Sequence, residues 1–136
     1  MLDELRDRIT EFISQHRISV ISTSGLSGEW AIPAWHQPLG LEMVCLLPRW
    51  SDALYHLEQD PRVMLIILDT QGDGLRWVQY RGNARVVDAS DWEKTLPQGM
   101  PKLHVDEGYV VVRITPVRID LIDESHGWGE RETLDV

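Results

Sequence analysis

The sequence predicts a mainly β (α+β) domain over residues 1-136: an antiparallel β-barrel of six or seven strands, with an N-terminal helix and two short peripheral helices. Three observations support this fold class. The length of 136 residues is that of one ordinary domain. Most predicted strands are joined by turns of hairpin length, and short turns require antiparallel pairing. A sheet of this size also removes its exposed edges when it closes into a barrel.

The chain begins with a predicted helix and a hairpin. In residues 2–16 the apolar side chains recur with helical spacing, which indicates an amphipathic helix. Residues 17–23 alternate apolar and polar side chains, as a strand does, and residues 24–28 supply a glycine-rich turn. The return strand is predicted over residues 30–36. Because Pro33 has no N–H group, we expect it at an edge position or a bulge.

A third strand, a short helix and a buried strand follow. Residues 41–47 form the predicted strand, and Ser51 is the predicted N-cap of a helix that ends at Gln59 before an Asp-Pro pair. Residues 62–69 carry a continuous apolar run. Such a run is typical of a strand covered on both faces, so we expect it to be the most buried strand of the sheet.

The next strand is expected to bend. It covers residues 75–88, and Gly82 within it indicates a bulge or a sharp bend. The spacing of Ser90 and Glu93 is that of a capping box, which predicts a short helix that stops at Pro97.

The C-terminal part is predicted as an irregular connection and one or two strands. Residues 97–107 contain Pro and Gly and form the connection. Residues 108–115 and 117–123 read as strand sequence interrupted by Pro116. Acidic side chains are concentrated near both ends of the chain, and solvation is the expected role of these charges.

The charge balance argues against several classes of partner. With 13 Lys and Arg against 22 Asp and Glu, the net charge is −9 and the pI about 4.9. Such a surface repels phosphate backbones and anionic lipids, so we expect no nucleic acid and no membrane partner. The first residues are charged where a signal peptide would be apolar. A single cysteine, Cys45, excludes an intramolecular disulfide, so a cytoplasmic location is expected.

The sequence contains no metal or nucleophile motif. The five His residues and Cys45 are scattered without ligand spacing, so no metal site is predicted. Cys45 lies among apolar residues, where a buried and inert thiol is expected. Gly72 and Gly74 are interpreted as a hairpin turn, because a strand pattern follows them and a dinucleotide fingerprint needs a helix there. No catalytic side chain is predicted.

Several segments in a fixed order resemble one known family. They are residues 19–23 after the first helix, Pro33-Ala34-Trp35, Ser51 followed by Leu57 to Val63, and Gly82-Asn83-Ala84. Their order and spacing resemble the FMN-binding split-barrel family of pyridoxamine 5'-phosphate oxidase-like proteins. The resemblance runs from about residue 3 to 88 and returns weakly at 109 to 128.

The resemblance implies a split-barrel homodimer with FMN in a groove at the subunit interface. In this family basic side chains on the second strand, and at the start of the helix after the third, hold the phosphate. Here the second strand carries Ala31 and His36 at those positions, and the helix start carries Asp52 and Ala53. Trp77 stands where the oxidases have a glutamine that approaches the flavin ring. The C-terminal Arg-x-His substrate motif is absent, so true pyridoxamine 5'-phosphate oxidase activity is not expected.

If the resemblance holds, other residues must substitute for the missing basic side chains. The candidate cofactor-binding residues are Trp35, His36, Leu47, Pro48, Arg49, Ser51 and Trp77. If FMN binds, Arg49 and the Ser51 helix end replace the missing basic pair, since a helix N-terminus favours phosphate. The alternatives are surface ion pairing for Arg49, capping alone for Ser51, and core packing for the indoles. Trp128, between two glycines, is the candidate substrate-binding residue, as a lid or a dimer contact.

The sequence therefore predicts a cytoplasmic, homodimeric FMN-binding protein that supports flavin-linked oxidation or reduction of a small molecule. The cofactor supplies the chemistry in such proteins, which agrees with the absence of a catalytic constellation. A deazaflavin or heme replaces FMN in some relatives of this fold. The alternative is a non-catalytic split-barrel dimer that has lost the phosphate site and acts as a ligand-binding or interaction module. A third candidate, an oligonucleotide-binding barrel, is opposed by the charge of −9.

Overall fold

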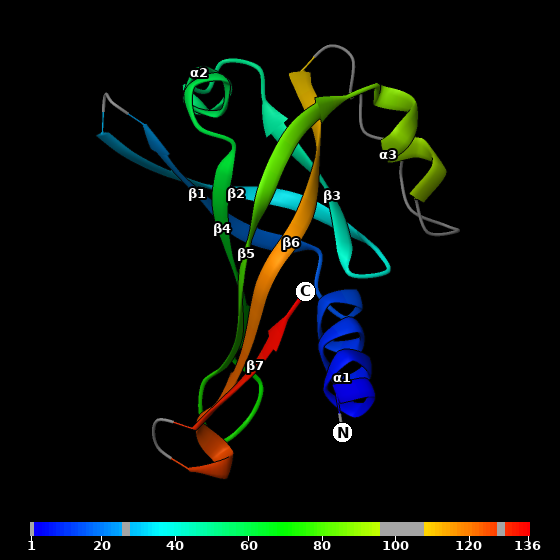
Figure 1. Cartoon of the computed structure of the whole chain (residues 1–136), viewed down its shortest axis with the longest axis vertical. Coiled ribbons are helices and arrows are strands. Elements are labelled where there is room, and N and C mark those ends of the chain that lie inside the picture. The colour runs from blue at the N-terminus through cyan, green and yellow to red at the C-terminus, as the bar shows by residue number, and fades with distance from the viewer. Residues whose placement is uncertain (1, 26–27, 96–107, 128–129) are drawn as a thin grey trace.

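The computed structural model describes residues 2–25, 28–95, 108–127 and 130–136. In this part of the chain seven strands form one antiparallel sheet in the order β3-β2-β1-β4-β5-β6-β7, and an additional β3–β6 pairing closes six of them into a barrel (Figure 1). The strands are β1 (Ile18–Gly25), β2 (Gly28–Leu39), β3 (Glu42–Pro48), β4 (Arg62–Asp69), β5 (Arg76–Val87), β6 (Tyr109–Asp123) and β7 (Arg131–Asp135). The helices are α1 (Leu2–Ser14), α2 (Ala53–Gln59), α3 (Ala89–Thr95) and the 3-10 turn η1 (Glu124–His126). The predicted fold class is confirmed.

Helix α1 is confirmed as amphipathic. Leu5, Ile9, Phe12 and Ile13 are buried on its inner face, and the helix contacts β2, β5 and β7. The helix ends at Ser14, two residues before the predicted end. None of the helices in the described part of the chain is long and apolar enough to cross a membrane.

Burial is distributed over the strands differently from the prediction. Strand β3, not β4, is the most buried strand, because Met43 to Leu47 are buried at every position. Its inner side faces the core, and its outer side packs in a cluster with Trp92 of α3. In β4 only alternate residues are buried, and Leu68 is 48% exposed. The expectation that residues 62–69 are covered on both faces was therefore wrong.

Pro33 occupies a local edge of the sheet, as predicted. Strand β2 pairs with β1 from Gly28 to Trp35 but with β3 only from Trp35 onward. At Pro33 the strand consequently has a single neighbour, so the missing N–H group leaves no ladder bond unmade.

The predicted irregularity at Gly82 is also confirmed. The β5–β6 register changes between Arg81, which pairs with Arg118, and Gly82, which pairs with Pro116, so Val117 is the extra residue of a bulge. Strand β6 is continuous across Pro116, which corrects the predicted break there.

Strand β7 was not predicted. It pairs with β6 and places Leu134 in the core, while Arg8 of α1 makes a two-point ion pair with Glu132. Part of the acidic C-terminal segment is therefore structural.

The N-terminus of α3 differs from the predicted capping box. The helix begins at Ala89, and the carboxylate of Asp88 accepts a hydrogen bond from the N–H of Ser90 at 2.9 Å. Asp88 rather than Ser90 therefore caps the helix, since a side-chain acceptor bonded to the second helical N–H defines the cap. The helix ends at Thr95, and both Pro97 and the predicted connection 97–107 lie outside the described residues.

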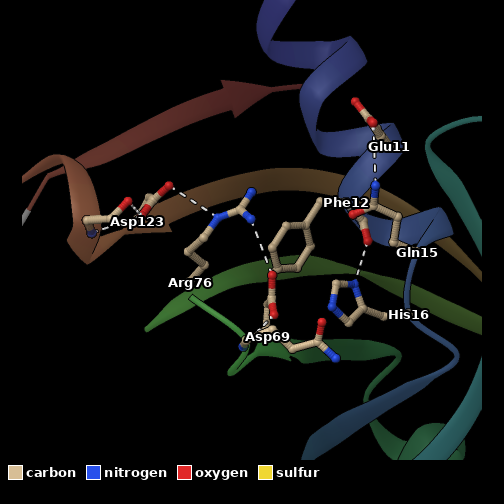
Figure 2. A network of polar contacts seen from close by, with 9 residues as sticks. Glu11, Phe12, Gln15, His16, Asp69, Arg76 and Asp123 are labelled. Atoms are coloured by element: carbon tan, nitrogen blue, oxygen red, sulfur yellow. Dashed lines mark hydrogen bonds and ion pairs between the residues drawn. The ribbon is translucent and has the colours of Figure 1, made fainter. Parts of the chain in front are cut away.

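An arginine braces one end of the barrel (Figure 2). Arg76 Nη1 lies 3.2 Å from Asp69 Oδ2, and its Nε lies 3.2 Å from Asp123 Oδ2. The guanidinium also lies over the ring of Phe12, 5.2 Å from the centroid. One side chain thus joins the ends of β4, β5 and β6 to helix α1.

Candidate functional site

The outer surface of the barrel carries a groove of about 840 Å³. It crosses the strands from the β1–β2 hairpin to β4, β5 and the bulge of β6, which lie side by side (Figure 1). The residues that line it are Ser22, Thr23, Ser24, Trp30, Ala31, Arg62, Val63, Met64, Arg81, Gly82, Asn83 and Val117. This volume is typical of a small-molecule or cofactor site.

The bulge between β5 and β6 shapes one side of the groove. A Cβ atom on Gly82 would lie 2.4 Å from the carbonyl oxygen of Thr115, so the two backbones approach more closely than any side chain permits. Because the bulge adds Val117 to β6, this side chain is 51% exposed and lines the groove. Bulges commonly redirect side chains in this way next to binding sites.

The groove is cationic in an acidic protein. Arg62 and Arg81 line it on neighbouring strands, and the described lining residues include no carboxylate. The ion pairs found among the described residues do not involve Arg81. A guanidinium without an intramolecular carboxylate is available to an anionic ligand.

Arg62 is held by an acidic neighbour. Its Nη2 lies 2.7 Å from Asp60 Oδ2, and its Nε donates to Asp60 Oδ1 at 3.0 Å. The hydrogen bonds from Arg62 lower the pKa of the Asp60 carboxyl to about 2, so this carboxylate is ionised at neutral pH. Arg62 therefore presents only part of its donor set to the groove.

The chemical type of the side chains that line the groove differs from strand to strand. Ser22 and Ser24 on β1 supply hydroxyl groups, and the two arginines lie on β4 and β5. Trp30 on β2 also lines the groove, but it pairs in register with buried Thr23 and packs against the core. Hydroxyl groups and cationic groups therefore follow one another across the strands.

The predicted site residues lie elsewhere. Trp35 is half-buried and packs against the cluster under α3. Leu47 is completely buried in the core, and Pro48 ends β3. The His36 side chain is inside the barrel, 2% exposed, with Nε2 3.3 Å from the carbonyl oxygen of Ile13. Burial lowers its pKa to about 4, so the ring is neutral and does not offer a positive charge to a phosphate.

The start of α2 differs from the predicted arrangement. Ser51 is not the N-cap: its hydroxyl donates to the carbonyl oxygen of Pro48 at 2.7 Å, and α2 begins at Ala53 after Asp52. The Asp52 side chain makes no capping hydrogen bond. Arg49 is exposed, and its backbone N–H donates to the carbonyl oxygen of Gly108 at 3.0 Å.

Trp77 and Trp128 are the two remaining predicted residues. Trp77 is half-buried near the start of β5, six residues from Asn83, which corresponds to about 20 Å along a strand. Trp128 lies outside the described residues. A group of three His, Cys, Asp or Glu side chains that could hold a metal ion does not occur in the part of the chain that the structure describes.

The sequence did not predict the groove residues as ligands. Gly82 was predicted only as a bulge, and Ala31 was noted only as a position where the family carries a basic side chain. Arg62 and Asn83 stood in the segments that carry the family resemblance and served only as markers of order. The signal that was available is the alternation of Arg81 and Asn83 on a strand whose intervening residue is glycine. That pattern places both polar side chains on one face beside a close backbone contact.

No family model matches the chain, and no curated protein matches it in sequence. Solved structures do match. A protein related to general stress protein 26, of the pyridoxinephosphate oxidase family, from Clostridium acetobutylicum has a TM-score of 0.78 at 13% identity, covering 98% of this chain and 96% of that chain. General stress protein 26 from Bacillus anthracis has a TM-score of 0.75 at 18% identity, with coverage of 98% and 99%.

An FAD-binding protein from Mesorhizobium loti is also similar, with a TM-score of 0.63 at 14% identity over 82% of this chain and 89% of that chain. At these identities the likeness concerns the fold. The chain has the split-barrel fold of pyridoxamine 5'-phosphate oxidase-like and general stress protein 26 structures, as the sequence resemblance implied.

Proposed function

We propose that this protein binds FMN in the groove and supports a flavin-linked oxidation or reduction of a small molecule. The observation that carries the proposal is that hydroxyl groups on β1 and then arginines on β4 and β5 follow one another across the groove. In FMN a polyhydroxyl chain likewise leads to a phosphate. The split-barrel fold, shared with an FAD-binding protein, supports a flavin as the ligand.

The groove residues fit such a ligand in their chemistry. Arg81, aided by Asn83, would hold the phosphate through charge-assisted hydrogen bonds. Ser22 and Ser24 would face the polyhydroxyl chain. Bound flavin accepts and donates electrons or hydride, so the protein has only to bind, orient and shield it. A cytoplasmic location remains part of the proposal, as expected from the single cysteine of the sequence.

Replacing Arg81 by glutamine should weaken FMN more than riboflavin, which lacks the phosphate. Loss of a charge-assisted hydrogen bond is worth about 1.5–3 kcal/mol, which is a tenfold or greater rise in Kd. Fluorescence titration of both flavins measures the effect. Arg85→Gln is the matched control, because Arg85 lies on the same strand but does not line the groove.

The residues predicted from the sequence give a competing expectation. If the phosphate is held beside α2, Arg49→Ala weakens FMN and Arg81→Gln does not, which would contradict the groove assignment. Equal affinity of the unaltered protein for FMN and riboflavin would favour the non-catalytic alternative. Asp52 at the start of α2 and Ala53 within it are the features that favour that alternative, because neither supplies a positive charge.

We also propose that the protein is a homodimer. The outer face of β1 and β4 beside the groove is apolar: Ile18, Val20 and Leu68 are 53%, 43% and 48% exposed, Ile66 is half-buried opposite Val20, and half-buried Met64 follows at the groove. A contiguous exposed apolar face of this kind marks an interaction surface. A second copy offers a matching apolar face through a two-fold axis, and obligate interfaces commonly bury more than about 2,000 Å².

Sedimentation of the protein at micromolar concentration should therefore give twice the chain mass of 15.7 kDa. Val20→Asp should shift it to the monomer, since it places a charge in the centre of the apolar face. Val86→Asp, at an exposed apolar residue away from this face, should leave the dimer intact. A monomer in the unaltered protein would contradict the proposal.

A further inference from the structure

The Asp60–Arg62 pair imitates a contact between arginine and phosphate. Arg62 donates from Nε to Asp60 Oδ1 at 3.0 Å and from Nη2 to Oδ2 at 2.7 Å, so two parallel hydrogen bonds join the groups. This is the two-point contact that a guanidinium makes with carboxylates and with phosphates alike. The Nε–Nη2 edge of the Arg62 guanidinium, which a ligand phosphate could use, is thus already engaged by a carboxylate of the same chain.

The pair lies at the cationic part of the groove. Arg62 lines the groove and pairs in register with Asn83, while the neighbouring Met64 pairs with Arg81. The two arginines are therefore diagonal neighbours on adjacent strands, about 7–8 Å apart between Cα atoms and within reach of one another's side chains. A phosphate at Arg81 would be a neighbour of the Arg62 guanidinium and of the carboxylate that holds it.

The contact is of a kind that a ligand can displace. The Arg62 side chain is 78% exposed and the Asp60 side chain 22%, so water reaches the pair from the arginine side, and ion pairs that water reaches contribute little net free energy. Asp60 keeps its negative charge throughout the physiological pH range, because the hydrogen bonds from Arg62 lower its pKa to about 2. The competition between carboxylate and phosphate is consequently present whenever a ligand binds.

We propose that Asp60 is a built-in competitor for the ligand's phosphate and limits the affinity of the groove for phosphorylated flavin. This inference rests on the proposed function. In the free protein the Asp60 carboxylate is bonded to Nε and Nη2 of Arg62. The phosphate must therefore either displace this carboxylate from Arg62 or bind next to its negative charge. Arg81 then makes most of the contacts to the phosphate, and Arg62 contributes only when the phosphate displaces Asp60.

The test is Asp60→Asn, which keeps the size of the side chain and removes its charge. FMN should bind about threefold to fivefold more tightly, the gain that corresponds to the loss of one exposed ion pair. Riboflavin should bind as before. In an Arg62→Gln background the gain should disappear, because the effect acts through Arg62. Weaker or unchanged FMN binding in Asp60→Asn, or a gain that persists without Arg62, would overturn the proposal.

Asp135→Asn is the matched control. Asp135 pairs with Arg118 Nε at 2.9 Å, and neither residue lines the groove. The variant removes the same charge, so an equal gain in FMN affinity would overturn the proposal in favour of a general charge effect.

Inorganic phosphate separates this inference from the proposed function. In ¹⁵N-labelled protein the Nε–H resonance of Arg62 should move with phosphate at lower concentrations in Asp60→Asn than in the unaltered protein. If the unaltered protein binds neither flavin, the proposed function fails, and the phosphate titration still decides whether Asp60 competes for Arg62. An identical titration in both proteins would overturn the competitor role.

Discussion

Replacing Gly82 by alanine should lower the free energy of unfolding by about 3 kcal/mol, the upper part of the range for overpacked sites. The new Cβ would lie 2.4 Å from the carbonyl oxygen of Thr115 and 2.9 Å from Cγ2 of Ile114. Neither atom moves easily, because the carbonyl belongs to the β6 backbone and Ile114 is completely buried. The strands must separate at the bulge, and the groove that depends on it should be disturbed.

Urea unfolding followed by far-UV circular dichroism measures this loss. Gly72→Ala is the control, because Gly72 lies in the exposed loop between β4 and β5 and a Cβ there meets no atom closer than 3.9 Å. It should change stability by less than about 0.5 kcal/mol. Equal unfolding midpoints for the two variants would show that the β5–β6 approach at Gly82 is not as close as described.

The second large effect is a fall in the free energy of unfolding at acidic pH, which we expect to be caused by protonation of His36. Burial lowers the pKa of its imidazole from 6.5 to about 4, and the neighbouring charges of His16 and Arg17 act in the same direction. The folded protein therefore binds fewer protons at this site than the unfolded chain between pH 6.5 and 4. The stability contributed by the neutral ring is complete above pH 6.5 and is lost as the pH falls towards 4. Over this window the loss amounts to about 3 kcal/mol.

The geometry explains why the charged form is excluded. Nε2 lies 3.3 Å from the carbonyl oxygen of Ile13, so it carries the proton of the neutral ring, while buried Nδ1 has no hydrogen-bond partner among the described residues. A second proton would therefore lie on a buried atom that makes no hydrogen bond among the described residues. His36→Gln should remove this part of the pH dependence, whereas His16→Gln should keep it. Parallel pH profiles for His36→Gln and the unaltered protein would contradict the assignment.

The fold was predictable where local patterns decide the structure. The spacing of Leu5, Ile9 and Phe12 defines α1, and Gly82 marks the bulge, because helical periodicity and the absence of a side chain act within one element. Burial of β3 was not predictable in this way. The burial of the outer side of β3 depends on Trp92 of α3, which lies more than forty residues further along the chain. Strand β7 was missed because its acidic residues resemble a solvated tail, yet Leu134 alone anchors it in the core.

The candidate site was harder to predict than the fold. The groove consists of residues from five strands, and only the register brings Arg62 and Arg81 to one place. The family resemblance instead suggested Arg49, Ser51 and His36 as substitutes for the missing basic side chains, because they lie at or near the same strand and helix ends in the sequence. The structure turns the His36 side chain into the core and gives the Ser51 hydroxyl to a carbonyl oxygen. Side-chain direction on a strand is set by pairing partners, which a single sequence does not specify.

The pairing that closes the barrel also bears on how the chain folds. Met43 of β3 pairs with Ile114 of β6, so closure joins residues that are 71 positions apart, whereas the β1–β2 hairpin forms between immediate neighbours. Contacts between distant residues are slow to form because the loop between them must first be ordered. The hairpins are therefore expected to form early and barrel closure late. Until closure occurs, the apolar residues of β3 remain uncovered, and this is the interval in which the chain is most prone to aggregate.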